Sequence, residues 1–188
     1  GTWYNFHIPE DGTPESMVHA MDLLGIDVSI ASPHICIGPC YLDGNRTVYQ
    51  AAKDFPGRIL PFVTVNPNSP ESEIIAEISH WDQQATIGFK LHPQCHNADA
   101  GHHNYDPVFE FCQERALPIL SHNWTGAPVN GKDTLYGLAE MFPRVTFIVA
   151  HAISGWGPLD TNCAAAKALP NVMLDTTGSL LTFDAVPE

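Results

Sequence analysis

The sequence repeats one unit, a short apolar run followed by a longer amphipathic stretch. The apolar runs begin near residues 26, 59, 86, 117, 145 and 171, so successive starts lie 26–33 residues apart. A parallel β-strand and the helix that returns the chain to the next strand need about 30 residues. The runs are apolar on both faces, which is typical of parallel strands covered by helices. The repeat therefore predicts an α/β fold.

The stretches between the apolar runs carry signals for helix starts and stops. Thr13-Pro14 offers a capping hydroxyl and a proline in the first turn, and Gly25 suits the end of that helix. Further helices are expected at about 46–55, 70–81, 106–115, 132–142 and 160–169. Residues 94–105 are expected to form the longest segment without regular structure, and its histidines, at 96, 102 and 103, are expected to be solvated or part of a mobile lid rather than metal ligands.

Six consecutive strand-helix units fit either a barrel or an open doubly wound sheet. No glycine-rich phosphate loop follows any run, which disfavours a nucleotide-binding open sheet. A complete (β/α)8 barrel needs about 250 residues, whereas this chain has 188. We therefore predict a single (β/α)8 TIM-barrel-like domain over residues 1–188 that is incomplete at both ends and lacks its first and last strands.

The charge of the chain argues against nucleic acid and membrane partners. The 21 acidic and 8 basic residues give a net charge of −13, and the basic residues are scattered. No run approaches the roughly 20 apolar residues of a membrane span, and no secretory signal is visible. The five cysteines form no C-x-x-C pair, which favours free thiols in the cytoplasm. We expect a cytoplasmic protein with a small-molecule substrate; the apolar loop 35–41 leaves a homo-oligomer open.

Two histidines close apolar runs in the same way, His122 after 117–121 and His151 after 145–150. In a barrel the active site lies at the carboxyl ends of the strands, so these side chains are expected to converge. Imidazole is a good ligand for zinc, manganese or iron, and a bound metal ion lowers the pKa of water. We predict His122 and His151 as metal ligands, with His151 also acting in catalysis.

Three more residues are predicted to bind substrate. Lys90 and His92 alternate along one strand and can share a face, while Trp124 follows His122 and can stack on a substrate. Asp175 ends the last run, where it either contributes to the site or caps the turn that follows.

Several segments, in their order and spacing, resemble the amidohydrolase-related (amidohydrolase 2) family of metal-dependent hydrolases, which includes lactonases, hydratases and decarboxylases. These segments are 88–93, 105–109, 117–122, 142–151 and 171–176. The resemblance implies a (β/α)8 barrel with a divalent metal, His122 as the ligand after the fifth strand, and His151 as a second ligand or acid/base. It also implies an H-x-H pair before Gly1 and an aspartate after Glu188, so Asp175 is not assigned as a ligand.

Three functions follow from this interpretation. The first is a metal-dependent hydrolase that acts on a small organic substrate through a metal-activated water, with zinc as the metal expected first and manganese or iron as alternatives. The second is a metal-dependent, non-oxidative decarboxylase of an aromatic or unsaturated carboxylic acid. The third is a non-catalytic, incomplete barrel that serves as a binding or structural module.

Overall fold

The computed structural model describes residues 12–32, 34–38, 40–82, 86–122, 132–152 and 159–176. The strands are β1 (Ser29–Ala31), β2 (Ile59–Pro61), β3 (Phe89–Leu91), β4 (Pro118–Ser121), β5 (Thr146–Val149) and β6 (Val172–Leu174). The longer helices are α1 (Pro14–Leu24), α2 (Tyr41–Asp54), α3 (Glu71–Asp82), α5 (Asp106–Arg115), α6 (Lys132–Met141) and α7 (Leu159–Ala168). Three single turns complete the described elements: η1 (His34–Ile37), α4 (Pro93–His96) and η2 (His103–Tyr105).

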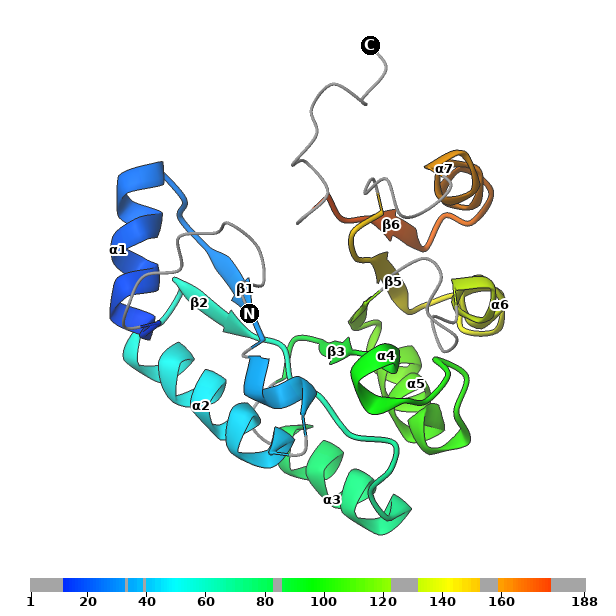
Figure 1. Cartoon of the computed structure of the whole chain (residues 1–188), viewed down its shortest axis with the longest axis horizontal. Helices are drawn as coiled ribbons and strands as arrows, with labels where there is room; N and C mark the ends of the chain where they lie inside the picture. Colours follow the sequence, from blue (N-terminus) through cyan, green and yellow to red (C-terminus); the bar gives the residue numbers. More distant parts are fainter. Residues whose placement is uncertain are drawn as a thin grey trace, which may run out of the picture.

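The strands pair in parallel and in the order of the sequence. β1 pairs with β2, and β3, β4, β5 and β6 form a four-stranded sheet in that order. A parallel bridge between Val63 and Phe89 joins the chain after β2 to β3. Figure 1 shows the row of strands curving, with the helices on its outer side. This arrangement confirms the predicted α/β fold with parallel strands.

Local signals placed most elements correctly. The Thr13 hydroxyl accepts a hydrogen bond from the Ser16 amide at 3.2 Å, and Gly25 ends α1 with φ +70°, a conformation that glycine adopts at little cost. Two expectations were wrong. α2 begins at Tyr41 rather than near residue 46, and residues 94–105 contain α4 and η2 rather than irregular chain alone.

The core lies between the strands and the outer helices and is rich in aromatic side chains. Phe89, Phe109 and Phe147 are fully buried. The ring centroids of Phe109 and Phe147 are 6.2 Å apart, and Phe111 meets the ring of Phe89 edge-on at 5.9 Å. Aromatic pairs of this kind add to the large apolar area that each ring removes from water. Burial of these rings therefore fixes α5 against β3 and β5.

The two outer strands of the row carry exposed apolar side chains. Ile30 on β1 is 54% exposed and Met173 on β6 is 56% exposed, whereas the apolar side chains of β2 to β5 are buried or half-buried. None of the described helices combines the length and the apolar character that crossing a membrane requires.

Gly88 provides a test of the packing between β2, β3 and β4. A Cβ at this position would lie 2.5 Å from Cε1 of Phe62 and 2.8 Å from the Pro118 carbonyl oxygen. We expect Gly88→Ala to lower the free energy of unfolding by roughly 1–3 kcal/mol, the usual cost of overpacking a core. A Cβ at Gly137 on α6 would have no other atom within 4 Å. Gly137→Ala should therefore raise the free energy of unfolding by about 0.5–1 kcal/mol. Urea unfolding of both variants measures the difference; equal effects would contradict this account of the packing.

Candidate functional site

Backbone hydrogen bonds align the carboxyl ends of β3 to β6. The amide of His122 donates to the Leu91 carbonyl at 2.9 Å, that of Ala150 to Ser121 at 3.0 Å, and that of Asp175 to Val149 at 2.9 Å. Polar side chains stand directly after these bonds: His92 follows β3, His122 follows β4, His151 lies two residues beyond β5, and Asp175 follows β6. Four neighbouring strands therefore present their polar residues at one edge.

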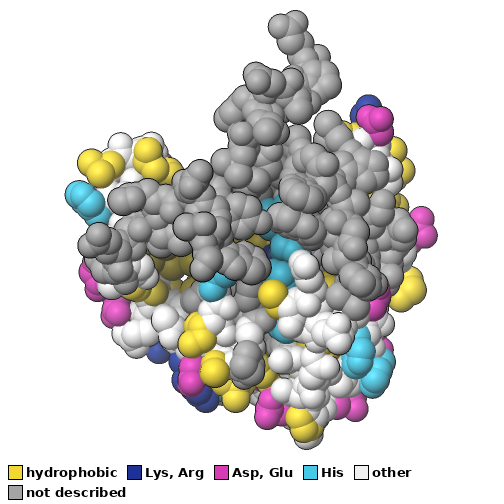
Figure 2. Space-filling model, in the orientation of Figure 1, with side chains coloured by type: hydrophobic (Ala, Val, Ile, Leu, Met, Phe, Trp, Pro, Cys, Tyr) yellow, Lys and Arg dark blue, Asp and Glu magenta, His cyan; other side chains and the backbone are white. Residues whose placement is uncertain are grey.

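Three of the predicted residues meet there as a row of imidazole rings. His92 stacks on His122 with the centroids 3.8 Å apart and the planes within 14° of parallel. His151 meets His122 edge-on, with the centroids 4.9 Å apart. His92 and His122 are each 8% exposed, and His151 is half-buried. Histidine side chains gather near the centre of the face drawn in Figure 2.

The single turn α4 directs several side chains at this row. His92 caps the turn, since its Nδ1 accepts a hydrogen bond from the Cys95 amide at 3.2 Å. The Cys95 thiol lies 3.7 Å from His92 Nε2, and Gln94 Oε1 lies 3.2 Å from His122 Nε2. The His92 ring is thus held by a backbone bond on one side and by the His122 ring on the other.

Lys90 lies between two fully buried neighbours, Phe89 and Leu91, and is itself half-buried. The Thr64 hydroxyl donates to the Lys90 carbonyl at 2.5 Å, and buried Asn45 both donates to the Thr64 carbonyl and accepts from its amide. Burial lowers the pKa of the Lys90 ammonium to about 8, an effect that the negative charge of Asp175 partly opposes. Lys90 and Asp175 therefore share an electrostatic environment although they lie on different strands.

Burial keeps the central imidazoles neutral. It lowers the pKa of His122 to about 3, and electrostatic interactions with Lys90 and His151 act in the same direction. Burial and the charges of His122 and Lys90 likewise hold the pKa of His92 far below its ordinary value. A neutral imidazole has one ring nitrogen whose lone pair can bind a metal ion or a proton. In His92 that nitrogen is Nδ1, which accepts the bond from the Cys95 amide, so His122 is the ring whose neutral form can act as a ligand.

His151 adopts a left-handed backbone conformation, with φ +57°. Such a conformation is uncommon for residues other than glycine, although histidine adopts it more often than most, and it is found in turns and functional sites. The bonds around it maintain the turn: the Ala152 amide donates to the Asp175 carbonyl at 2.9 Å, and the Asn162 side chain donates to the Ala152 carbonyl at 2.9 Å. Asn162 is 1% exposed, so this support is internal.

The donor set can be tested against a divalent metal ion. His122 and His151 offer two imidazoles at adjacent strand ends, and a divalent ion such as zinc takes at least three protein ligands in a catalytic site. The part of the chain that the structure describes contains no group of three or more histidine, cysteine, aspartate or glutamate side chains placed to hold a metal. Within the described ranges, His122 and His151 thus offer two imidazole donors at adjacent strand ends, fewer than a catalytic metal site requires.

Two residues near the row of histidines were not predicted from the sequence, and one predicted site residue lies outside the described ranges. Gln94 carries no motif and became visible only through its contact with His122. His96, expected to be solvated, is 3% exposed and fixed in place. Trp124 lies outside the described residues. Of the other two histidines expected to be solvated, His103 is exposed and His102 is half-buried.

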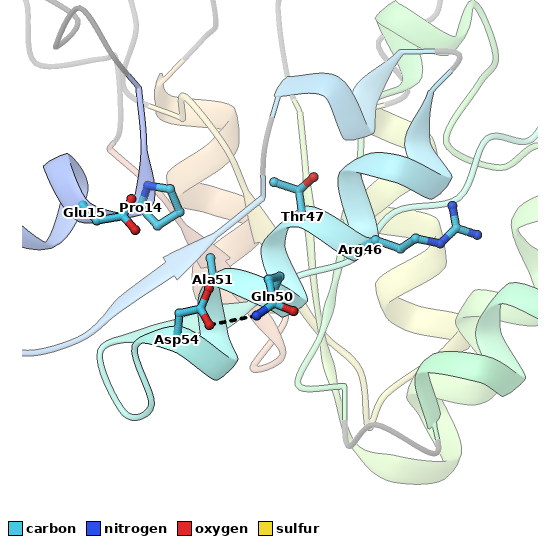
Figure 3. Close-up of a pocket in the computed structure, with 7 residues that line it drawn as sticks. All are labelled: Pro14, Glu15, Arg46, Thr47, Gln50, Ala51 and Asp54. Atoms are coloured by element: carbon cyan, nitrogen blue, oxygen red, sulfur yellow. Dashed lines mark hydrogen bonds between the residues drawn. The ribbon is translucent and has the colours of Figure 1, made fainter.

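A separate hollow of about 490 Å³ lies between α1 and α2. Figure 3 shows its lining, which includes Glu15, Arg46 and Asp54, with a hydrogen bond from Gln50 to Asp54. It contains none of the histidines and its charged side chains are exposed. The cluster of histidines therefore lies at the strand ends and not in this hollow.

A family model described as amidohydrolase matches residues 9–187. The chain belongs to the amidohydrolase family. No curated protein matches it in sequence. The family assignment confirms the resemblance noted above.

Several solved structures share the fold of this chain. An uncharacterised TIM-barrel protein from Bordetella bronchiseptica is 17% identical, with a TM-score of 0.74 over 92% of this chain and 62% of its own. The 4-oxalomesaconate hydratase of Rhodopseudomonas palustris is 17% identical, with a TM-score of 0.65 over 94% and 64%. The manganese-bound 5-carboxyvanillate decarboxylase of Novosphingobium aromaticivorans is 21% identical, with a TM-score of 0.58 over 73% and 49%. The chain thus has the TIM-barrel type of fold and spans less than two thirds of each of these structures.

The lowered pKa values predict how stability depends on pH. An unfolded histidine has an ordinary pKa of 6.5, whereas His96 and His122 in the fold have pKa values of about 4 and about 3. Below pH 6.5 these histidines therefore bind protons in the unfolded chain but remain neutral in the folded protein until the pH reaches their lowered pKa values. Stability should be complete above that pH and fall as the pH decreases, by up to about 1.4 kcal/mol per pH unit for each such histidine.

Urea unfolding of chelator-treated protein between pH 7 and pH 4 measures this dependence. The free energy of unfolding of His122→Asn should fall less steeply with decreasing pH than that of the unsubstituted protein, because the variant lacks one histidine whose pKa differs between the folded and unfolded states. His103→Asn is the matched control: its ring is exposed, and the profile should not change. A profile that is flat across this range would contradict the burial of neutral imidazoles.

Proposed function

We propose that this protein is a metal-dependent enzyme of the amidohydrolase family, and that His122 and His151 supply two of the ligands of a divalent metal ion. The observation that carries the proposal is the row of rings at three adjacent strand ends, with His122 between His92 and His151. Buried, neutral imidazoles at this end of a barrel are suited to metal binding. The proposal treats residues 1–188 as a single domain and zinc as the first metal to test.

Each side chain has a distinct role in this proposal. The stacked His92 ring holds the plane of His122, so that the ring nitrogens of His122 point in fixed directions. Gln94 Oε1 now lies beside His122 Nε2, and Gln94 is exposed, so metal binding at this nitrogen requires the amide to turn away. His151 serves as a ligand or as the base that accepts a proton from water. A bound divalent metal would lower the pKa of water and polarise a carbonyl group.

Hydrolysis of a small organic substrate is the reaction we place first. Non-oxidative decarboxylation of an aromatic or unsaturated acid is the second candidate, and the buried ammonium of Lys90 favours it. A cation beside the imidazole row can hold a carboxylate in spite of the net charge of −13. The similarity to a manganese-bound carboxyvanillate decarboxylase supports the same alternative. Water labelled at its oxygen atom separates the two reactions. Hydrolysis places the labelled oxygen in the organic product, whereas decarboxylation releases carbon dioxide and adds no water oxygen to the organic product.

Metal content tests the proposal most simply. Elemental analysis of the purified protein should give close to one divalent ion per chain, and His122→Asn should lose most of it. His151→Asn should also reduce metal content. Asparagine is the substitution of choice at residue 151 because it tolerates the left-handed backbone found there, so the loss can be assigned to the imidazole.

The matched control is His80→Asn, which removes an exposed histidine on α3 and should leave the metal content unchanged. Equal metal content in the unsubstituted protein and both site variants would mean that these histidines are not ligands. The absence of bound metal after growth and dialysis with zinc or manganese would favour the non-catalytic binding module instead.

A further inference from the structure

His96 is a buried histidine that the roles assigned so far do not use. It ends the turn α4 and is 3% exposed. Its carbonyl accepts a hydrogen bond from the Asn68 side chain at 2.7 Å, and its Nδ1 lies 2.6 Å from the Tyr105 hydroxyl. Both the backbone and the ring are therefore held in one position.

The hydrogen bond to Tyr105 determines which ring nitrogen of His96 carries the proton. Tyr105 is fully buried, and burial raises the pKa of its hydroxyl, so this group stays protonated. A buried hydroxyl must donate its hydrogen to an acceptor, and the partner that the structure provides is His96 Nδ1. In a neutral imidazole the proton then resides on Nε2. Burial and the charge of Lys90 lower the pKa of His96 to about 4, which keeps the ring neutral.

The Nε2–H group of His96 is a donor without an acceptor. It is one of two buried side-chain polar atoms among the described residues that lack a hydrogen-bond partner; the other is the Ser32 hydroxyl. Native structures satisfy nearly all such groups, so an unsatisfied donor at this position points to a bound ligand or water. The ring edge that carries Nε2 is the edge turned away from Tyr105.

Lys90 is the charged group that acts on this donor. After burial, its positive charge contributes to lowering the pKa of His96, His92 and His122, so the ammonium lies near enough to act on each of these rings. None of the hydrogen bonds among the described residues involves the Lys90 ammonium group. An ammonium and a neutral N–H that act together form strong, charge-assisted hydrogen bonds with an anionic oxygen. One positive charge matches a carboxylate better than a phosphate dianion.

We propose that His96 is a substrate-binding residue, whose Nε2–H donates to a carboxylate oxygen of the substrate together with the ammonium group of Lys90. The proposal rests on the proposed function, because it names the substrate class of the same site: a small molecule with a carboxylate. Tyr105 is the positioning residue, since it selects the ring tautomer that makes Nε2 a donor.

Benzoate is a suitable probe, with benzyl alcohol as its uncharged counterpart, and calorimetry gives the dissociation constant. His96→Leu should weaken benzoate binding by about tenfold, equivalent to about 1.4 kcal/mol, and should leave the affinity for benzyl alcohol unchanged. His96→Gln should restore most of the benzoate affinity, because its amide can accept from Tyr105 and still donate. His103→Leu, an exposed change in the same segment, should have no effect.

A second measurement does not depend on the folding of any variant. Nuclear magnetic resonance of isotope-labelled imidazole nitrogens should show His96 protonated at Nε2, and benzoate should shift that signal. Tyr105→Phe should weaken benzoate binding and let the proton redistribute between the two nitrogens. Unchanged benzoate affinity in His96→Leu, an Nε2 signal that benzoate does not move, or no benzoate binding at millimolar concentration would each overturn the proposal and leave water as the partner of Nε2.

These outcomes can be separated from failure of the proposed function. Benzoate binding is measured on metal-loaded protein and on chelator-treated protein, because Lys90 and His96 should hold the carboxylate in both. Loss of the metal without loss of the His96-dependent binding would contradict the metal site alone. A normal metal content with benzoate affinity indifferent to His96 would contradict only the carboxylate contact.

Discussion

The site depends on the register of the parallel strands. Three backbone hydrogen bonds, from His122 to Leu91, from Ala150 to Ser121 and from Asp175 to Val149, set the ends of β3 to β6 level with one another. A shift of one residue would send each side chain to the opposite face of its strand. The register is itself fixed by the aromatic core, because the strands bury Phe89 and Phe147 against α5. Core packing and site geometry are thus two consequences of one alignment.

The site also places groups where they are costly for the fold. Two stacked histidines are buried in the neutral form, the half-buried Lys90 acts on them with its positive charge, and His151 adopts a left-handed backbone. Features of this kind oppose folding and persist when the surrounding structure is strong enough to impose them. Here that support comes from internal hydrogen bonds, with Asn45 and Thr64 behind Lys90 and Asn162 behind the turn of His151. Features that lower local stability in this way are common at binding and catalytic sites.

The sequence predicted the strands well because apolar runs at regular spacing are a long-range signal that packing reinforces. It also predicted that His122 and His151 end neighbouring strands, from which their proximity follows. It failed where one helical turn decides the outcome. α4 is too short for any periodicity, so His96 was expected to be solvated although it is buried, and Gln94 was not considered. The stacking of His92 on His122 depends on side-chain conformations that no spacing encodes.

The central claim is that His122 and His151 bind one divalent metal at the strand ends. X-ray absorption spectroscopy of the zinc-loaded protein tests it most directly, because scattering from imidazole rings is distinct from that of carboxylates and water. The account predicts imidazole scattering in the unsubstituted protein, reduced by one ring in His122→Asn and in His151→Asn and retained in His92→Asn. A spectrum without imidazole ligands, or one that neither substitution changes, would contradict it.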